Sequence, residues 1–143
     1  MEVNNNVITA ITLIERLKPL CHARDRQPIS ARNVKQIQDR IGLALQLIGP
    51  VMTNGLVLSS LGDLTTLIDV MLEDKTFVET NEESKSIIND KIDTALGQLY
   101  LFAGKYYETH EFEFDLGLTD VLCRIVDYNI DNGYYFHMEE NQQ

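Results

Sequence analysis

Apolar residues recur at helical spacing along almost the whole chain, and this spacing constrains the fold more than any other feature. Residues three and four positions apart share one face of a helix, so each apolar stripe predicts a helix with one buried side. The segment 110–115 alternates as a strand would, but a lone strand has no pairing partner, so we expect an extended loop there. The pattern therefore predicts an all-α protein. The first stripe, which ends before Pro19, comprises Val7, Ile11, Ile14 and Leu17.

Two further stripes predict a second and a third helix. Ser30 is a good N-cap residue for the second helix. Gly49 and Pro50 should end that helix, because glycine tolerates a positive φ and proline cannot continue the hydrogen-bond ladder. Ser59 or Ser60 is expected to cap the third helix. The predicted buried positions are Val34, Ile37, Ile41, Ala44, Leu45 and Ile48 in the second helix, and Leu61, Leu64, Leu67, Ile68, Met71 and Leu72 in the third.

A fourth and a fifth helix complete the predicted set of about five. Residues 80–83 have the spacing of a capping box, in which a hydroxyl and a carboxylate bind backbone N–H groups at the start of a helix. The helix that follows is predicted over 87–102 and is expected to end at Gly104. The last helix is predicted over 116–130, with Gly133 as its cap.

The 143 residues fit one domain, 1–143, and a weak internal duplication predicts its organisation. A helical hairpin buries its apolar stripe poorly alone, so two hairpins, 34–75 and 81–131, are predicted to form a four-helix core beside the N-terminal helix. The tail, 139–143, is expected to fray. The matching segments are 37–41 with 88–92 and 44–45 with 95–96 at an offset of 51, and 64–65 with 118–119 at an offset of 54.

The net charge of −10 is unevenly distributed along the chain. The first forty residues carry seven Lys or Arg and four acidic residues, a net of +3, whereas the remaining 103 carry five basic and eighteen acidic residues, a net of −13. The acidic part repels nucleic-acid phosphates, so we expect no direct nucleic-acid binding. It attracts a basic protein surface. The same charge also serves solubility alone, and the sequence leaves both interpretations open.

The location of the protein in the cell is predicted from three features: the start of the chain, its apolar runs and its cysteines. The start of the chain lacks the basic region and apolar stretch of a secretory signal. The longest apolar run, 41–51, is interrupted by glycine, glutamine and proline, so we expect no membrane-spanning helix. Cys21 and Cys123 have no metal or redox spacing and are expected to be reduced, largely buried thiols. These observations predict a cytoplasmic protein.

Three short stretches resemble motifs of the MazG-like nucleotide pyrophosphohydrolases, all-α enzymes that use a divalent metal to hydrolyse nucleoside triphosphates to monophosphate and pyrophosphate. Residues 117–127, GLTDVLCRIVD, are similar to the Glu-Leu-Ala-Asp-Val helix of that family and its Arg-Ile-x-Asp continuation. Residues 88–96, INDKIDTAL, are similar to the first metal helix. Residues 60–64, SLGDL, are similar to a Glu-Leu-Gly-Asp-Leu variant of the second motif. The resemblance implies the helical fold.

Most of the acids that the resemblance implies for Mg²⁺ binding are replaced. The two glutamates of the first motif fall on Lys91 and Thr94, and the glutamate of the second motif falls on Gly117, so that only Asp120 is kept there. A lysine in a ligand position places one cation against another. The earlier stretch, 60–64, has serine in place of glutamate and keeps its aspartate.

One alternative set of metal ligands remains in the sequence. Asp90 and Asp93 have the three-residue spacing that places two acids on one helix face, and with Asp120 they form the candidate Mg²⁺ site. These two acids lie one residue before the positions that the motif aligns with the metal ligands, so they are rotated by about 100° around the helix. We therefore assign no catalytic residue and expect no cofactor unless the enzyme interpretation holds, in which case the cofactor is Mg²⁺.

An aromatic and acidic segment after the fourth helix is the candidate partner-binding site. Tyr and Phe are enriched at the centres of protein interfaces, and acids favour a basic partner. The same rings can instead plug the open end of the bundle, and the sequence leaves this alternative open. The candidate residues are Tyr106, Tyr107, Glu108, Glu111, Phe112, Glu113, Phe114 and Asp115, and a second aromatic group follows at Tyr134, Tyr135 and Phe136.

The sequence favours a non-catalytic MazG-like helical protein that acts, as a homodimer, as an acidic protein-binding regulator or inhibitor. A nucleic-acid-binding enzyme with a basic cleft is the kind of protein partner that fits this charge. The first alternative is a divalent-metal-dependent nucleoside triphosphate pyrophosphohydrolase. The second is a nucleotide-sensing module that binds without hydrolysis, through the basic residues of the first forty.

Overall fold

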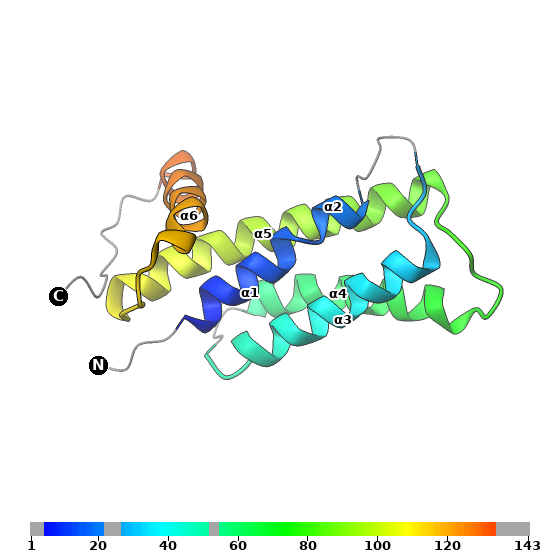
Figure 1. The fold of residues 1–143 in the computed structure, drawn as a ribbon, viewed down its shortest axis with the longest axis horizontal. Coiled ribbons are helices and arrows are strands. Elements are labelled where there is room, and N and C mark those ends of the chain that lie inside the picture. Colours follow the sequence, from blue (N-terminus) through cyan, green and yellow to red (C-terminus); the bar gives the residue numbers. More distant parts are fainter. Residues whose placement is uncertain (1–4, 22–26, 52–54, 134–143) are drawn as a thin grey trace.

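The computed structural model describes residues 5–21, 27–51 and 55–133, and over these residues the chain is an all-α helical bundle (Figure 1). The predicted fold class is confirmed. The predicted tail at 139–143 and the aromatic residues at 134–136 lie outside the described residues. The elements in chain order are α1 (Asn6–Glu15), α2 (Lys18–Cys21), α3 (Ala31–Ile48), α4 (Gly55–Glu73), α5 (Glu82–Thr109), the 3₁₀ turn η1 (Leu116–Leu118) and α6 (Thr119–Asp131).

The helices α1, α3, α4 and α5 run along the long axis of the molecule with the short α2 beside α5, and α6 crosses that axis at one end (Figure 1). The consecutive helices of the two predicted hairpins contact each other, α3 with α4 and α5 with α6. The N-terminal helix α1 packs against α3 and α5 and so completes the long four-helix layer, while α6 packs mainly on α5. The sequence predicted that the two hairpins form the four-helix core with the N-terminal helix beside it, whereas α1 lies among the long helices and α6 lies across α5. Helical spacing identifies the buried face of each helix but not the neighbour that covers it.

The first half of the duplication extends to the helix caps. The side chains of Ser30 and Asn81, which are 51 residues apart, each accept a hydrogen bond from the backbone N–H three residues further on. The residues before both caps bind each other, because Thr80 N donates to Ile29 O and Ile29 N donates to Thr80 Oγ1, both at 2.9 Å. The predicted capping box is therefore shifted, with Asn81 and not Thr80 as the cap. The equivalent buried pairs are Ile37 and Ile88, Ile41 and Ile92, Ala44 and Ala95, and Ile48 and Leu99.

The second half of the duplication has no such counterpart in the fold. Leu64 is fully buried within α4, whereas Leu118, its match at an offset of 54, is half-buried in η1 before α6 begins. Gly133 follows α6 with a φ of 83°, the left-handed conformation that glycine adopts without strain, as its predicted capping role requires.

Two predicted helix ends differ from the structure, and a third, at Gly49, lies where it was predicted but with another backbone conformation. α4 begins at Gly55, so Ser59 and Ser60 lie inside the helix and do not cap it. Gly49 has a φ of −50° and ψ of −46°, which is right-handed helical and not positive. Gly104 does not end α5, which continues to Thr109. Tertiary contacts override the local signals in this last case, because Gly104 lies buried beneath α6.

The apolar character of α4 also differs from the sequence-based expectation. By length and composition alone α4 is apolar enough to cross a membrane, with a mean hydropathy of 1.5, whereas we expected no such segment. The helix contains Asp63 and Asp69, and the Asp69 carboxylate accepts a 2.5 Å hydrogen bond from the Gln38 amide of α3. Its fully buried side chains, which form one stripe, are Val57, Leu61, Leu64 and Ile68.

Two glycines of α5 allow α6 to approach closely. A Cβ atom at Gly104 would lie 2.6 Å from Oδ1 of Asn129, and a Cβ atom at Gly97 would meet the hydroxyl end of Tyr128. Asn129 is fully buried and donates through Nδ2 to the backbone oxygen of Tyr100 at 2.9 Å and to one within α6 at 2.8 Å. These contacts fix where α6 crosses α5.

Candidate functional site

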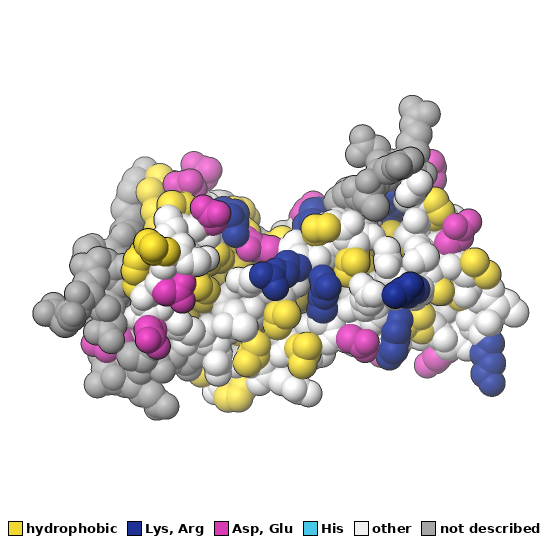
Figure 2. All heavy atoms as spheres, viewed as in Figure 1, with side chains coloured by type: hydrophobic (Ala, Val, Ile, Leu, Met, Phe, Trp, Pro, Cys, Tyr) yellow, Lys and Arg dark blue, Asp and Glu magenta, His cyan; other side chains and the backbone are white. Residues whose placement is uncertain are grey.

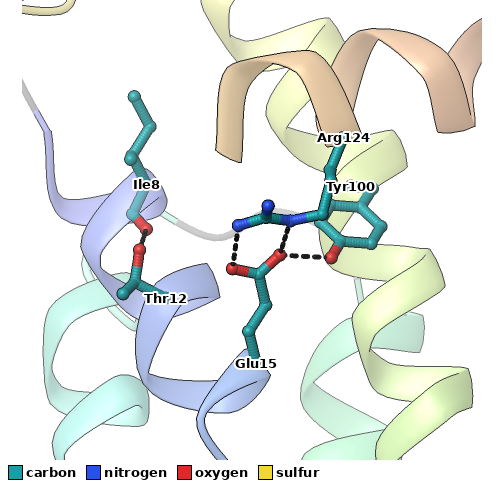
Figure 3. A network of polar contacts seen from close by, with 5 residues as sticks. All are labelled: Ile8, Thr12, Glu15, Tyr100 and Arg124. Atoms are coloured by element: carbon teal, nitrogen blue, oxygen red, sulfur yellow. Dashed lines mark hydrogen bonds and ion pairs between the residues drawn. The ribbon is translucent and has the colours of Figure 1, made fainter. Parts of the chain in front are cut away.

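A charged network ties α6 to the rest of the bundle (Figure 3). Arg124 of α6 donates through Nε and Nη2 to the Glu15 carboxylate of α1, at 2.5 and 2.8 Å. Tyr100 of α5 donates its hydroxyl to the same carboxylate at 2.5 Å. The hydrogen bonds that Arg124 donates to Glu15 raise the pKa of its guanidinium further, and burial together with the nearby Glu15 carboxylate raises the pKa of the Tyr100 hydroxyl. Three helices thus meet at one carboxylate.

Replacing Glu15 by glutamine is expected to lower the free energy of unfolding by about 1–3 kcal/mol, because charge-assisted hydrogen bonds are lost around a side chain that is only 16% exposed. Urea unfolding followed by circular dichroism measures this change. The matched control is Asp39→Asn, which breaks the exposed Lys35–Asp39 pair and should change stability by less than about 0.5 kcal/mol. Equal effects of the two substitutions would contradict a structural role for the network.

The three aspartates predicted to bind Mg²⁺ are not brought together. Asp93 faces α2, where its Oδ1 lies 2.5 Å from Nζ of Lys18, and Asp120 is exposed at the start of α6. Within 5–21, 27–51 and 55–133, no group of three or more His, Cys, Asp or Glu side chains is arranged to hold a metal ion. The predicted set of Asp90, Asp93 and Asp120 is corrected accordingly. The physical reason is that α6 crosses α5 over its glycines, beyond the turn that carries Asp90 and Asp93.

A small polar pocket of about 160 Å³ lies between α4 and α5 instead. It joins the stretch at 60–64 to the stretch at 88–96, the places where the MazG-like resemblance puts metal ligands. Lys91 contributes a cation beside two carboxylates, so the pocket does not have the all-oxygen lining that Mg²⁺ prefers. The residues that line it are Ser60, Asp63, Asp90, Lys91 and Thr94.

Comparison with known proteins does not place the chain in a family. No family model, curated protein or solved structure matches it. The MazG-like resemblance therefore stays a proposal that rests on the residues at 60–64, 88–96 and 117–127.

The structure divides the predicted partner-binding segment into core and surface. Tyr107 and Phe112 are 0% and 1% exposed and pack edge to face, with ring centroids 5.3 Å apart, so both rings belong to the core, as in the alternative that the sequence left open. Tyr106 is half-buried, and its ring stacks on the exposed ring of His110 with the two ring centroids 4.0 Å apart. Phe114 is 39% exposed. The acids also differ, since Glu108, Glu113 and Asp115 are exposed and Glu111 is half-buried.

An apolar groove of about 400 Å³ lies between the 112–114 segment and α6, and we call it the α6 groove. The Asp115 carboxylate accepts a 2.7 Å hydrogen bond from Gly117 N and so starts η1, which turns the chain from this segment into α6. Leu116 and Ile130, which are 86% and 42% exposed, add apolar surface on η1 and α6. The residues that line the groove are Phe112, Phe114, Thr119, Leu122, Cys123, Val126 and Asp127.

The residues of α6 that line this groove were not predicted from the sequence as partner contacts. Val121, Leu122 and Ile125 are the buried apolar residues of α6, and Leu122 also begins a second apolar row, displaced by one residue, that continues to the half-buried Val126 and the exposed Ile130. Two stripes on one short helix are a detectable signal, because a helix that only covers a core needs one. The groove itself was not detectable, since its other wall depends on how residues 112–114 fold back.

The surroundings of the α6 groove are acidic. Residues 105–133 contain seven acidic residues against two basic ones, and one of those, Arg124, is paired with Glu15. Figure 2 shows Asp and Glu side chains among apolar ones at the α6 end, while Lys and Arg side chains gather over the middle of the same face. The electrostatic field at the groove therefore favours a positively charged ligand.

The two cysteines lie in different environments. Cys21 is buried and Cys123 is exposed, so the expectation of two largely buried thiols is wrong for Cys123. Burial raises the pKa of the Cys21 thiol to about 11. Because the thiolate is the reactive form, Cys21 is expected to stay unreactive near neutral pH while Cys123 reacts.

A maleimide is therefore expected to label one thiol of the folded protein quickly at about pH 7.5 and the other only after unfolding. The fast reaction should disappear in Cys123→Ser and persist in Cys21→Ser. Since burial keeps Cys21 both inaccessible and protonated, its labelling should stay slow throughout the near-neutral pH range in which maleimide is selective for thiols. Mass spectrometry over time measures both reactions, and equal fast labelling of the two thiols would contradict the burial of Cys21.

Proposed function

We propose that this chain is a non-catalytic helical protein that regulates another protein by binding it through the α6 groove and the acids around it. The observation that carries the proposal is an apolar groove of about 400 Å³ within a strongly acidic end of the molecule. Interfaces combine an apolar centre with a charged rim, and the charge selects partners of opposite sign. A basic protein surface is the partner that this combination fits.

The arrangement of the acids supports binding over hydrolysis. Metal-dependent pyrophosphate release needs several carboxylates around one site, whereas Asp93 is paired with Lys18 and Asp120 lies apart from it on α6. The pocket at the MazG-like positions holds Lys91 among its lining residues. A MazG-like origin with lost metal ligands is consistent with both features and forms part of the proposal.

Affinity capture from a whole-cell extract of the source organism tests the proposed function. The test variant replaces Glu113, Asp120 and Asp127 by the matching amides at the α6 end. Its matched control removes the same number of charges at the opposite end of the bundle. The control substitutions are Glu73→Gln, Glu79→Gln and Glu83→Gln.

The protein partner is expected to be captured by the wild type and the control variant but not by the test variant. Recovery of the same proteins by all three would contradict the proposal. So would release of pyrophosphate from a nucleoside triphosphate with Mg²⁺ or Mn²⁺ that Asp120→Asn abolishes, because that result would establish the enzyme alternative.

A further inference from the structure

We infer that the α6 groove receives an amphipathic helix of the partner, with apolar residues on one face and Lys or Arg beside them; this inference rests on the proposed function. The α6 wall carries the first argument. Leu122, Val126 and Ile130 are four residues apart and form one ridge along α6, in which the buried Leu122 and the half-buried Val126 line the groove and the exposed Ile130 continues the ridge beyond that lining. At 1.5 Å per residue the ridge extends about 12 Å, which is long enough for another helix to pack along it.

The opposite wall carries the second argument. An extended peptide would add to an exposed strand edge, but no strand occurs within the described parts of the chain. The backbone of Glu113 in this wall is already bound on both sides by Asn5, which donates to Glu113 O at 3.0 Å and accepts from Glu113 N at 2.9 Å. Pairing of a strand at this point would have to displace Asn5, whereas a helix needs only the apolar side chains.

The charges around the ridge carry the third argument. Asp127 lines the groove itself, and Glu113, Asp115, Asp120 and Asp131 are exposed on the segments that form it. A purely apolar helix would leave these carboxylates without compensation, whereas Lys and Arg side chains reach outward from a buried apolar face. The occupant is therefore a basic amphipathic helix and not a neutral one.

Three synthetic peptides of 18 residues serve as probes with the full-length protein. The first contains leucine and lysine at helical spacing, the second has the same composition with strict alternation, and the third has serine in place of leucine. Binding is measured by fluorescence anisotropy, and occupancy of the groove by the rate of maleimide labelling at Cys123. The helical peptide should bind at least about tenfold more tightly than either other peptide and slow the labelling by at least about tenfold at saturation.

Two protein variants locate the binding. Phe114→Ala combined with Val126→Ser should weaken binding of the helical peptide by about tenfold, because both side chains line the groove and neither is fully buried. Val70→Ser, a substitution at an exposed apolar residue of α4, should leave the binding unchanged. Thermal unfolding of each variant shows that a change in affinity does not reflect loss of the fold.

Several outcomes would overturn the inference. Equal binding of the alternating peptide would show that the groove does not select a helix, and equal binding of the serine peptide would show that charge alone decides affinity. Protection of Cys123 that disappears on dilution without peptide would identify a second copy as the occupant. Much faster labelling of a chain truncated after Gly133 would identify the chain's own C-terminal segment. If the α6 charges capture a partner that the helical peptide does not displace, the inference fails while the proposed function stands; loss of both overturns both.

Discussion

Replacing Phe112 by alanine is expected to lower the free energy of unfolding by about 3–5 kcal/mol, the cost typical of deleting a buried aromatic ring. The Phe112 side chain is 1% exposed and packs edge to face on Tyr107, which is itself fully buried. The substitution leaves a cavity where the 110–115 segment meets the bundle, and the surrounding helices can fill it only in part. For a chain of this length the melting temperature should fall by about 3 °C for each kcal/mol.

Phe114→Ala is the matched control for this prediction, because it removes the same ring two residues away. Phe114 is 39% exposed and lines the α6 groove, so its loss should cost less than about 1.5 kcal/mol. Urea unfolding of both variants compares the two effects. Similar costs at the two positions would show that the division of this segment into core and binding surface is wrong.

Replacing Gly104 by alanine is expected to lower the free energy of unfolding by about 1–3 kcal/mol, although alanine favours helices more strongly than glycine. The new Cβ atom would lie 2.6 Å from Oδ1 and 2.8 Å from Nδ2 of Asn129. Asn129 cannot move aside easily, because it is fully buried and its Nδ2 donates two hydrogen bonds. The overlap therefore shifts α6 or breaks those hydrogen bonds.

Gly42→Ala is the matched glycine substitution that is expected to raise the free energy of unfolding instead of lowering it. Gly42 lies within α3, and a Cβ atom there would meet nothing within 4 Å, so alanine should stabilise the protein by about 0.5–1 kcal/mol.

In an Asn129→Ala background, Gly104→Ala should lose most of its cost, because the atoms that the Cβ meets are gone. A destabilising effect of the same size in both backgrounds would contradict this packing.

The sequence determined that the chain is helical and which face of each predicted helix is buried, although Leu45, Leu67, Met71 and Leu72 of the predicted stripes are only half-buried. The spacing of Ile37, Ile41 and Ile48 permits only one buried helix face, and the same pattern 51 residues later predicted the equivalent stripe of α5. These features are local, because helix periodicity and capping depend on residues within one or two turns. The all-α class and the capping positions of Ser30 and Gly133 were predictable for this reason.

The tertiary structure alone decided where α6 lies, and with it the candidate site. Gly104 has the local signature of a helix end, yet α5 continues through it to Thr109. A glycine stands at this position because Asn129 of α6 occupies the space that a side chain would need. That crossing separates Asp120 from the acids of α5 and places Val126 opposite Phe114, so it removes the predicted metal site and forms the α6 groove. Contacts between residues far apart in the sequence set this crossing, and helical spacing carries no information about them.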